Sequence, residues 1–207
     1  MADDIETALG AAARAPVGDA TARLSRRLAA GAGRAGLIDV AYAEVDSPLG
    51  PLLAARTERG LVMLAYTLDG AEPRLERLSR EVSPRLVEAP ARLDRERREI
   101  DEYFAGRRQR FDIPIDWSLV RGFARGVLER TAAIPFGQAS TYAAIAAEAG
   151  SPRGSRAAGN ALGSNPIPIV IPCHRVLRSG GALGGYTGGL DRKRFLLSLE
   201  MGDRAPG

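Results

Sequence analysis

The strongest constraint on the fold of this chain is a change in the spacing of its apolar residues near Trp117. Before that point, apolar runs of strand length alternate with turn formers: LIDVAYAEV, SPLG, PLLAART, ERG and LVMLAYTL. After it, apolar residues recur at helical spacing. A chain of 207 residues is long enough for two small cores. The change therefore predicts one domain over residues 37–118 and a second over residues 119–207.

The first domain is expected to contain three antiparallel strands, because turn formers at residues 48–50 and 58–60 separate its three apolar runs. Charged helices are expected over residues 72–80 and 93–104. The stretch FDIPID predicts an edge strand or an extended connector, since Pro114 has no N–H to donate to a sheet.

The second domain begins with a predicted helix that ends near Pro135. One of its faces is apolar, with Val120, Phe123, Ala124, Val127 and Leu128. Ser140 or Thr141 can cap the next helix, and Ser155 can cap a shorter one that ends near Leu162. Because a tight glycine-containing turn separates these two short helices, the pattern predicts a helix-turn-helix.

The second helix of this motif, SRAAGNALG, is almost bare of large side chains. One interpretation is a helix packed tightly against a neighbour. The other is a helix that comes very close to a nucleic acid, with Arg156 as its one long cationic side chain. The sequence leaves both interpretations open.

Cys173 and His174 are the only cysteine and the only histidine of the chain, and they are adjacent in IVIPCHRV. A single cysteine excludes an internal disulfide, and the pair cannot fill a four-ligand zinc site, so no metal is expected. A lone cysteine is often a buried apolar residue. It becomes a nucleophile when a histidine takes its proton and a third group orients that histidine. Neighbours in a strand point to opposite faces, so connecting the two side chains requires a turn or a bridging water.

The charge is unevenly distributed along the chain. Residues 1–118 carry 18 arginines and 20 acidic residues, whereas residues 119–207 carry 11 basic and 5 acidic residues. The C-terminal part is therefore the candidate for binding a polyanion. The N-terminus is acidic and no run of about 18 apolar residues occurs, which favours a cytoplasmic protein without a membrane segment. Residues 1–36, rich in Ala, Arg and Gly, fit either a helical extension or a mobile arm.

Two stretches together carry a family resemblance: FGQASTYAAIAAEAG and SNPIPIVIPCHRVLRSGGALGGYTGGLDRKRFLLSLE. They closely resemble the methylated-DNA-protein-cysteine methyltransferases, the alkylguanine-DNA alkyltransferase repair family. The resemblance is weaker but consistent over residues 40–118, in VDSPLGPLLAA and EYFAGRRQRFDIPI, and it does not include residues 1–36. The sequence departs from many members in the helix with Phe123, where Ala124 and Val127 or Leu128 replace a glutamine and a tryptophan.

The resemblance implies an α+β fold. Its N-terminal domain would be ribonuclease H-like with a small antiparallel sheet, and its C-terminal domain would be an all-α, winged-helix-like unit with a helix-turn-helix. It also implies an activity: irreversible transfer of an alkyl group, once per molecule, from O6-alkylguanine or O4-alkylthymine in double-stranded DNA to the protein's own cysteine. No cofactor is expected. We expect a monomer in solution, with cooperative binding along DNA left open.

By the same resemblance, Cys173 accepts the alkyl group, His174 is the water-relayed base, and Glu200 orients His174. Asn165 is the hinge between the recognition helix and the active-site loop. Tyr142 would lie near the flipped nucleotide and donate to the purine ring or the 3′ phosphate. From the residues alone, Glu200 fits a solvated surface position and Asn165 an ordinary turn.

The resemblance also implies a set of DNA contacts. Arg156 would enter the base stack in place of the flipped nucleotide, and the neighbouring contacts would come from Ser155, Ala157 and Asn160. The substrate pocket would be walled by Pro168 and Tyr186, with Thr187 and Gly188 near the alkylated oxygen. Tyr186 could also simply anchor its loop. Arg175 fits an internal salt bridge as well as a phosphate contact.

Two other functions are compatible with parts of the sequence. A non-reactive damage sensor would flip the lesion and recruit other proteins, but in such proteins the cysteine is typically replaced. A thiol hydrolase would use Cys173 and His174 on ester substrates, and it would leave the helix-turn-helix and Arg156 without a role.

Overall fold

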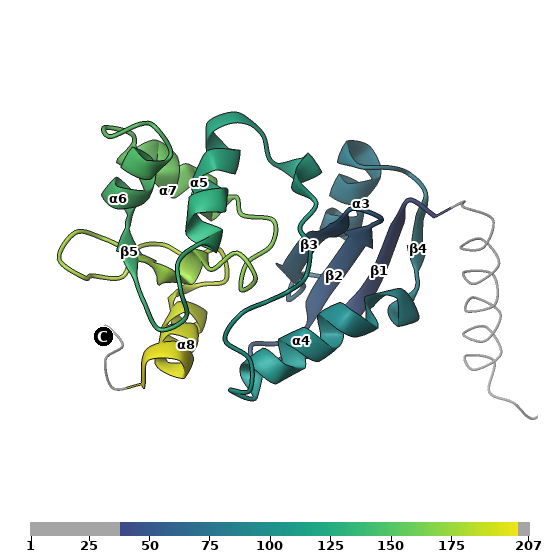
Figure 1. Cartoon of the computed structure of the whole chain (residues 1–207). Helices are drawn as coiled ribbons and strands as arrows, with labels where there is room; N and C mark the ends of the chain where they lie inside the picture. The colour runs from purple at the N-terminus through teal and green to yellow at the C-terminus, as the bar shows by residue number, and fades with distance from the viewer. Residues whose placement is uncertain (1–37, 203–207) are drawn as a thin grey trace, which may run out of the picture.

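A mixed four-stranded sheet forms the centre of the N-terminal half (Figure 1). The computed structural model describes residues 38–202, so the expectation for residues 1–36 lies outside the described part. The strand order is β3-β2-β1-β4, with bounds β1 (Val40–Val45), β2 (Leu52–Thr57), β3 (Gly60–Tyr66) and β4 (Leu86–Glu88). The three expected strands are present, and they pair in antiparallel fashion as predicted.

The fourth strand corrects the expectation of a purely antiparallel, three-stranded sheet. β4 runs parallel to β1, with Val40 opposite Leu86 and Tyr42 opposite Glu88. It has only three residues, and none of them is fully buried. Such a segment shows neither a long apolar run nor a clear alternation, so the sequence carries no strand signal there.

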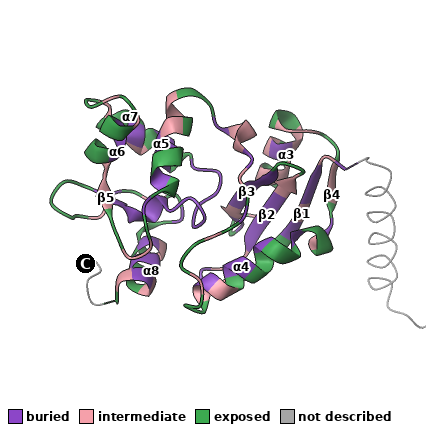
Figure 2. Ribbon diagram, in the orientation of Figure 1, coloured by how far each residue is buried: buried purple, intermediate pink, exposed green. Residues whose placement is uncertain are grey.

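One helix covers each face of this sheet (Figure 2). α4 (Asp94–Phe104), preceded by the 3₁₀ turn η1 (Pro90–Leu93), packs Ile100 and Tyr103 into the larger core cluster. α3 (Glu72–Glu81) packs Leu78 against the opposite face, with Leu53 and Met63. Both helices match their predicted bounds to within one residue.

The segment between the domains runs beside the edge strand β3. The N–H of Leu61 donates to Pro114 O, and the N–H of Asp116 donates to Leu61 O, each over 2.8 Å. Only an isolated bridge to Ile115 forms, so FDIPID is an extended connector rather than a strand. Gly60 (φ +137°) permits this approach, because a Cβ there would lie 2.1 Å from Pro114 O.

Four helices build the C-terminal half: α5 (Gly122–Ala132), α6 (Tyr142–Glu148), α7 (Ser155–Gly163) and α8 (Leu190–Met201). α5 packs against the α6–α7 helix-turn-helix. Val127 and Leu128 are buried as expected, but Val120 precedes the helix in extended backbone. The helix starts only at Gly122, whose φ of +57° turns the chain. None of the helices within residues 38–202 is long and apolar enough to cross a membrane.

The two short helices differ in how they begin. Thr141 caps α6, its hydroxyl accepting from the N–H of Ala144 over 3.2 Å. Ser155 does not cap α7, because the cap position is Gly154. The N–H of Gly154 bonds back to Ser151 O over 2.8 Å, and a Cβ at Gly154 would lie 2.5 Å from the Ser151 hydroxyl. The turn thus closes on the glycine, and the helix begins one residue earlier than predicted.

The expectation of an all-α C-terminal domain needs one correction. β5 (Ser140–Thr141) pairs in parallel with β6 (Val176–Leu177). Strands of two residues have no recognisable sequence pattern. They matter here because they place the start of α6 beside the segment that follows Cys173.

Candidate active site

The loop before Cys173 is held from inside by Asn165. Its Nδ2 donates to Ile171 O over 2.9 Å, and its Oδ1 accepts from the N–H of Ile167 over 3.0 Å. Asn165 is therefore a buried brace that closes the loop rather than an ordinary turn residue. The sheet holds the same loop from outside, since the N–H of Leu64 donates to Pro166 O over 2.9 Å.

Ile169 lies at the apex of this loop with a φ of +75°. Among residues 38–202 it is the only non-glycine residue in the left-handed region, and it is completely buried. A left-handed isoleucine costs on the order of 1–3 kcal/mol. The hydrogen bonds across the loop, including that from Ile171 N–H to Ile167 O, hold it in place.

Cys173 begins the 3₁₀ turn η3 (Cys173–Arg175), so it and His174 do not point to opposite faces of a strand. The thiol is 4% exposed, and burial raises its pKa to about 11. A hydrogen bond from Asn165 and the positive charge of Lys193 act in the opposite direction. At neutral pH the resting thiol is therefore protonated.

Glu200 lies against His174, with Oε1 2.9 Å from Nε2 and both side chains fully buried. Oε1 also accepts from Tyr103 over 2.6 Å and from Arg175 Nη2 over 2.9 Å. Arg175 Nε donates to Oε2 over 2.7 Å. The bonds from His174 and Arg175 outweigh burial and lower the pKa of Glu200 to about 2. Glu200 is thus a buried, ionised carboxylate, and the solvated surface position is wrong.

These contacts fix the tautomer of His174. An ionised carboxylate only accepts hydrogen bonds, so Nε2 of the imidazole carries the proton. Burial lowers the pKa of His174, which keeps the ring neutral. Nδ1 is then a free lone pair, buried and without a hydrogen-bond partner in the described part of the chain. The imidazole therefore presents its basic nitrogen on the side away from Glu200.

Of the two roles that the sequence left open for Arg175, an internal salt bridge and a phosphate contact, the structure shows the salt bridge. It forms a buried ion pair with Glu200 and donates from Nη1 to Ile134 O over 2.5 Å. It therefore fills a structural position within the fold.

Lys193 is a residue near the thiol that sequence reasoning missed. Its Nζ donates to Val176 O over 2.7 Å and to Gly184 O over 3.4 Å, and its side chain is completely buried. Burial lowers the pKa of Lys193 to about 8. The available signal was its rarity, because Lys193 is the only lysine among 29 basic residues.

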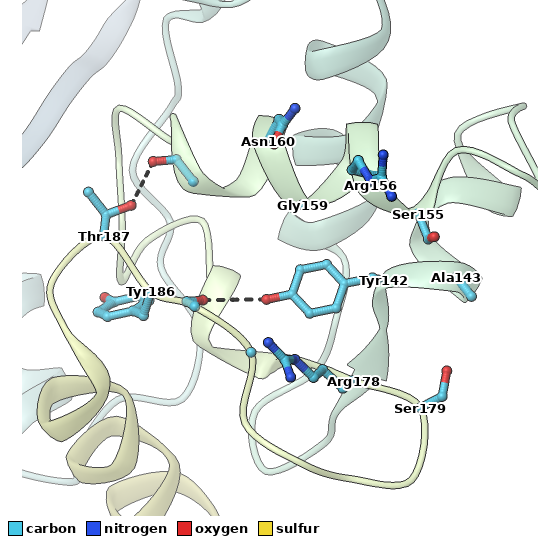
Figure 3. A pocket seen from close by; sticks show the side chains of 13 residues that line it. Tyr142, Ala143, Ser155, Arg156, Gly159, Asn160, Arg178, Ser179, Tyr186 and Thr187 are labelled. Atoms are coloured by element: carbon cyan, nitrogen blue, oxygen red, sulfur yellow. Dashed lines mark hydrogen bonds between the residues drawn. The ribbon is translucent and has the colours of Figure 1, made fainter.

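An open pocket of about 710 Å³ lies between α6, α7 and the loop after β6 (Figure 3). Of the predicted residues, those that line it are Tyr142, Ser155, Arg156, Asn160, Tyr186 and Thr187. Ala157 is exposed on α7 but does not line the pocket. Pro168 is buried and lines a smaller pocket of about 250 Å³ that shares Thr187. Gly188 is buried against Tyr66.

Tyr142 fits into the pocket because its neighbours are glycines. A Cβ at Gly184 would lie 2.2 Å from the Tyr142 hydroxyl, so no other residue fits there without moving the ring. The hydroxyl donates to Gly185 O over 3.4 Å. Burial raises the pKa of both Tyr142 and Tyr186, and a charge on Cys173 would raise it further. Cys173 does not line the pocket, but the ring of its neighbour His174 lies edge-on to that of Tyr186 in the pocket wall, with centroids 6.5 Å apart.

Arg156 and Arg178 lie on either side of Tyr142 in Figure 3. Both are exposed, and neither guanidinium has an ion pair or hydrogen bond with any residue between 38 and 202. Arg178 was missed by sequence reasoning, although its place after the apolar run and before two glycines was a signal for an exposed basic loop. The pocket thus carries two cations that no residue from 38 to 202 neutralises.

A buried thiol, a neutral histidine next to it in the chain and a cationic pocket on a helix-turn-helix together define a DNA-binding protein with a reactive cysteine. Residues 122–202 match the family model described as 6-O-methylguanine DNA methyltransferase, DNA binding domain. Residues 40–117 match the ribonuclease-like domain of the same family. The chain belongs to the 6-O-methylguanine DNA methyltransferase family.

Similar proteins agree with both domains. The methylated-DNA–protein-cysteine methyltransferase of Methanosarcina barkeri is 39% identical over 77% of this chain and 96% of its own length. The O6-methylguanine methyltransferase of Mycobacterium tuberculosis has a similar crystal structure, with a TM-score of 0.68, 37% identity, and coverage of 81% of this chain and 96% of that one. The Mycobacterium tuberculosis protein in complex with DNA gives a TM-score of 0.66 at 36% identity, with the same coverage.

Proposed function

We propose that this protein repairs double-stranded DNA by transferring an alkyl group from O6 of guanine, or O4 of thymine, to the sulfur of Cys173. The observation that carries the proposal is the free Nδ1 of His174, which follows the buried thiol of Cys173 in the chain and whose ring lies edge-on to Tyr186 in the wall of a cationic pocket. One chain holds all of these residues, so the reaction needs no residue from a second copy.

The reaction needs only groups of this chain, one water and the lesion. Nδ1 of His174 takes the thiol proton through the water. The thiolate of Cys173 attacks the alkyl carbon, the carbon–oxygen bond breaks, and its electron pair stays on the oxygen of the base. The proton then passes from His174 to the nucleobase. An alkylated nucleobase and a thiol have thus become a repaired nucleobase and a thioether. Lys193 stabilises the negative sulfur along this path.

Burial of the sulfur favours the neutral thioether product over the thiolate. The surroundings that raise the pKa of Cys173 to about 11 disfavour the thiolate but accommodate a neutral thioether. The carbon–sulfur bond of a thioether is stable and does not hydrolyse at neutral pH. The protein is therefore consumed, with one alkyl group accepted per molecule.

The open pocket would receive the flipped nucleotide. An alkylated oxygen inside a base stack is out of reach, so the base must leave the stack at a cost of a few kcal/mol. Arg156 is the exposed long side chain of α7 and fills the gap, with Ser155, Ala157 and Asn160 beside it. Tyr142 donates to the purine ring or the 3′ phosphate and stabilises charge on the leaving base.

Labelled DNA tests the proposal. Duplex DNA with a radioactive methyl group on O6 of guanine should transfer one label per protein, and Cys173→Ser should transfer none while it still binds the duplex. Sustained turnover beyond one label per molecule would refute the proposal. Intact-mass measurement separates it from a damage sensor, since a sensor binds the lesion without gaining alkyl mass.

A further inference from the structure

The N-terminal domain reaches the reaction centre through one side chain, Tyr103 on α4. Its hydroxyl donates to Oε1 of Glu200 over 2.6 Å, although the two residues lie 97 positions apart in the chain. Both side chains are buried. Figure 1 shows the C-terminal end of α4 directed toward α8, which carries Glu200. The bond therefore joins the two domains at the carboxylate that contacts His174.

The ring of Tyr103 is fixed by an aromatic cluster. Its centroid lies 5.3 Å from that of Phe104, 5.2 Å from that of Phe111 and 6.3 Å from that of Phe136. The guanidinium of Arg175 in turn lies over Phe136, at 5.9 Å. A phenylalanine at position 103 would keep all of these ring contacts. The hydroxyl thus adds something that packing does not require.

The Tyr103 hydroxyl and His174 Nε2 donate to the same oxygen of Glu200. Oε1 of Glu200 accepts from Tyr103, from His174 Nε2 and from Arg175 Nη2, whereas Oε2 accepts, among residues 38–202, from Arg175 Nε only. Each donor takes part of the negative charge of the oxygen and so weakens its pull on the imidazole proton. Removing one neutral donor should strengthen the hold of the carboxylate on His174.

We propose that Tyr103 is a positioning residue for alkyl transfer: its hydroxyl holds Glu200 in place and limits how strongly that carboxylate draws the proton of His174. This inference rests on the proposed function, in which His174 is the base. The N-terminal domain then sets the basicity of Nδ1 instead of serving only as a scaffold.

The other groups around His174 also affect its pKa. Burial, Arg175 and Lys193 lower the pKa of His174, and Glu200 raises it. Cys173 is the adjacent residue, and Tyr186 from the glycine-rich loop lies edge-on, with ring centroids 6.5 Å apart. Glu200 is thus the only one of these groups that favours the imidazolium, which makes its strength the quantity that Tyr103 controls.

The test uses the fact that His174 is the only histidine of the chain. An NMR titration of the full-length protein follows its ring without ambiguity. Tyr103→Phe should raise the proton affinity of the imidazole about tenfold, the effect of one hydrogen bond to a charged group. The acid limb of the pH–rate profile for alkyl transfer should move to higher pH by the same amount, whereas a loss of packing alone would slow transfer equally at every pH.

Tyr66→Phe is the matched control. It removes another hydroxyl contact between the domains, the 3.1 Å bond between Tyr66 and Tyr186, without touching Glu200. Its effect on the His174 titration should be much smaller. An unchanged titration in Tyr103→Phe, or equal shifts in both variants, would overturn the inference.

A measurement on the unaltered protein guards against a variant that does not fold. The Tyr103 hydroxyl proton should exchange slowly and resonate downfield, because it is buried in a short bond to a carboxylate. A fast-exchanging hydroxyl would overturn the inference. The NMR titration and the exchange measurement do not require alkyl transfer, so the failure of Cys173 to accept a label would be a separate result.

Discussion

Glu200 in the reaction centre accepts hydrogen bonds from three side chains, whereas Arg156 and Arg178 in the pocket have no ion pair with any residue from 38 to 202. The first region is complete in the free protein. The second presents charges that no residue of the described part neutralises and that a polyanion such as DNA would pair with. Under the proposed function, the contrast separates two tasks: the reaction centre is organised before DNA arrives, and DNA would supply the counter-charges of the pocket.

The largest effect should come from removing the negative charge of Glu200 in the reaction centre. Glu200→Gln leaves Arg175 buried without its counter-charge, so we expect the free energy of unfolding to fall by about 3–5 kcal/mol, with alkyl transfer lost as well. Urea unfolding measures the change. Glu76→Gln is the control, because Glu76 is an exposed carboxylate on α3 and should shift stability by less than about 0.5 kcal/mol. Similar small losses in both variants would mean that the centre is not built around its carboxylate.

Lowering the pH should remove the same stabilising charge and so lower the free energy of unfolding. The pKa of Glu200 lies near 2, below its ordinary value of 4.5, so its ionised form stabilises the fold above pH 4.5. That contribution, about 3 kcal/mol, is lost as the pH falls toward 2. The lowered pKa of His174 acts in the same direction below about pH 6.5, because only the unfolded chain takes up that proton readily.

Unfolding by urea at several pH values measures this slope. Below pH 4.5 the stability of the unaltered protein should fall more steeply than that of Glu200→Gln, which has no carboxylate to protonate at this position. Parallel curves would show that the carboxylate is not held ionised by its neighbours.

The two regions also differ in what the sequence could predict. Cys173, His174, Tyr142 and Arg156 lie in local motifs that a single stretch of chain displays. Tyr103 lies within a predicted helix, but its contact with Glu200 joins residues 97 positions apart, and no local pattern reports such a contact.

The missed strands have a related cause. β4 has three residues, and β5 and β6 have two each, which is shorter than the alternation on which a strand prediction depends. Their pairing is decided by neighbours brought from elsewhere in the fold. Long apolar runs with turn formers between them, such as those of β1, β2 and β3, were predictable because their signal is contained within the segment.

Removing a positive charge from the pocket should slow alkyl transfer from duplex DNA without lowering the stability of the fold. Arg156→Ala should reduce alkyl transfer from duplex DNA by about thirtyfold, since filling the gap in the stack offsets part of the few kcal/mol needed to flip a base. Transfer from a free alkylguanine base, which needs no flipping, should change far less. Rates with the two substrates measure the ratio, and equal losses would contradict the finger role of Arg156.

The smallest expected effect concerns Arg178, which sharpens the contrast because it is the cation that no motif predicted. Its place is set by backbone bonds, from Arg178 N–H to Ala182 O and from Gly181 N–H back to Arg178 O, so the charge is held at the pocket edge before DNA binds. A guanidinium that contacts one phosphate contributes about 0.9 to the salt dependence of binding.

Arg178→Ala should therefore lower the slope of log affinity against log salt by about that amount, with a severalfold loss of duplex affinity whatever the sequence. Arg130→Ala, an exposed arginine at the end of α5 and outside the pocket lining, is the control and should leave the slope nearly unchanged. An unaltered slope in Arg178→Ala would mean that DNA passes this side of the pocket without contact. The open region would then depend on Arg156 alone.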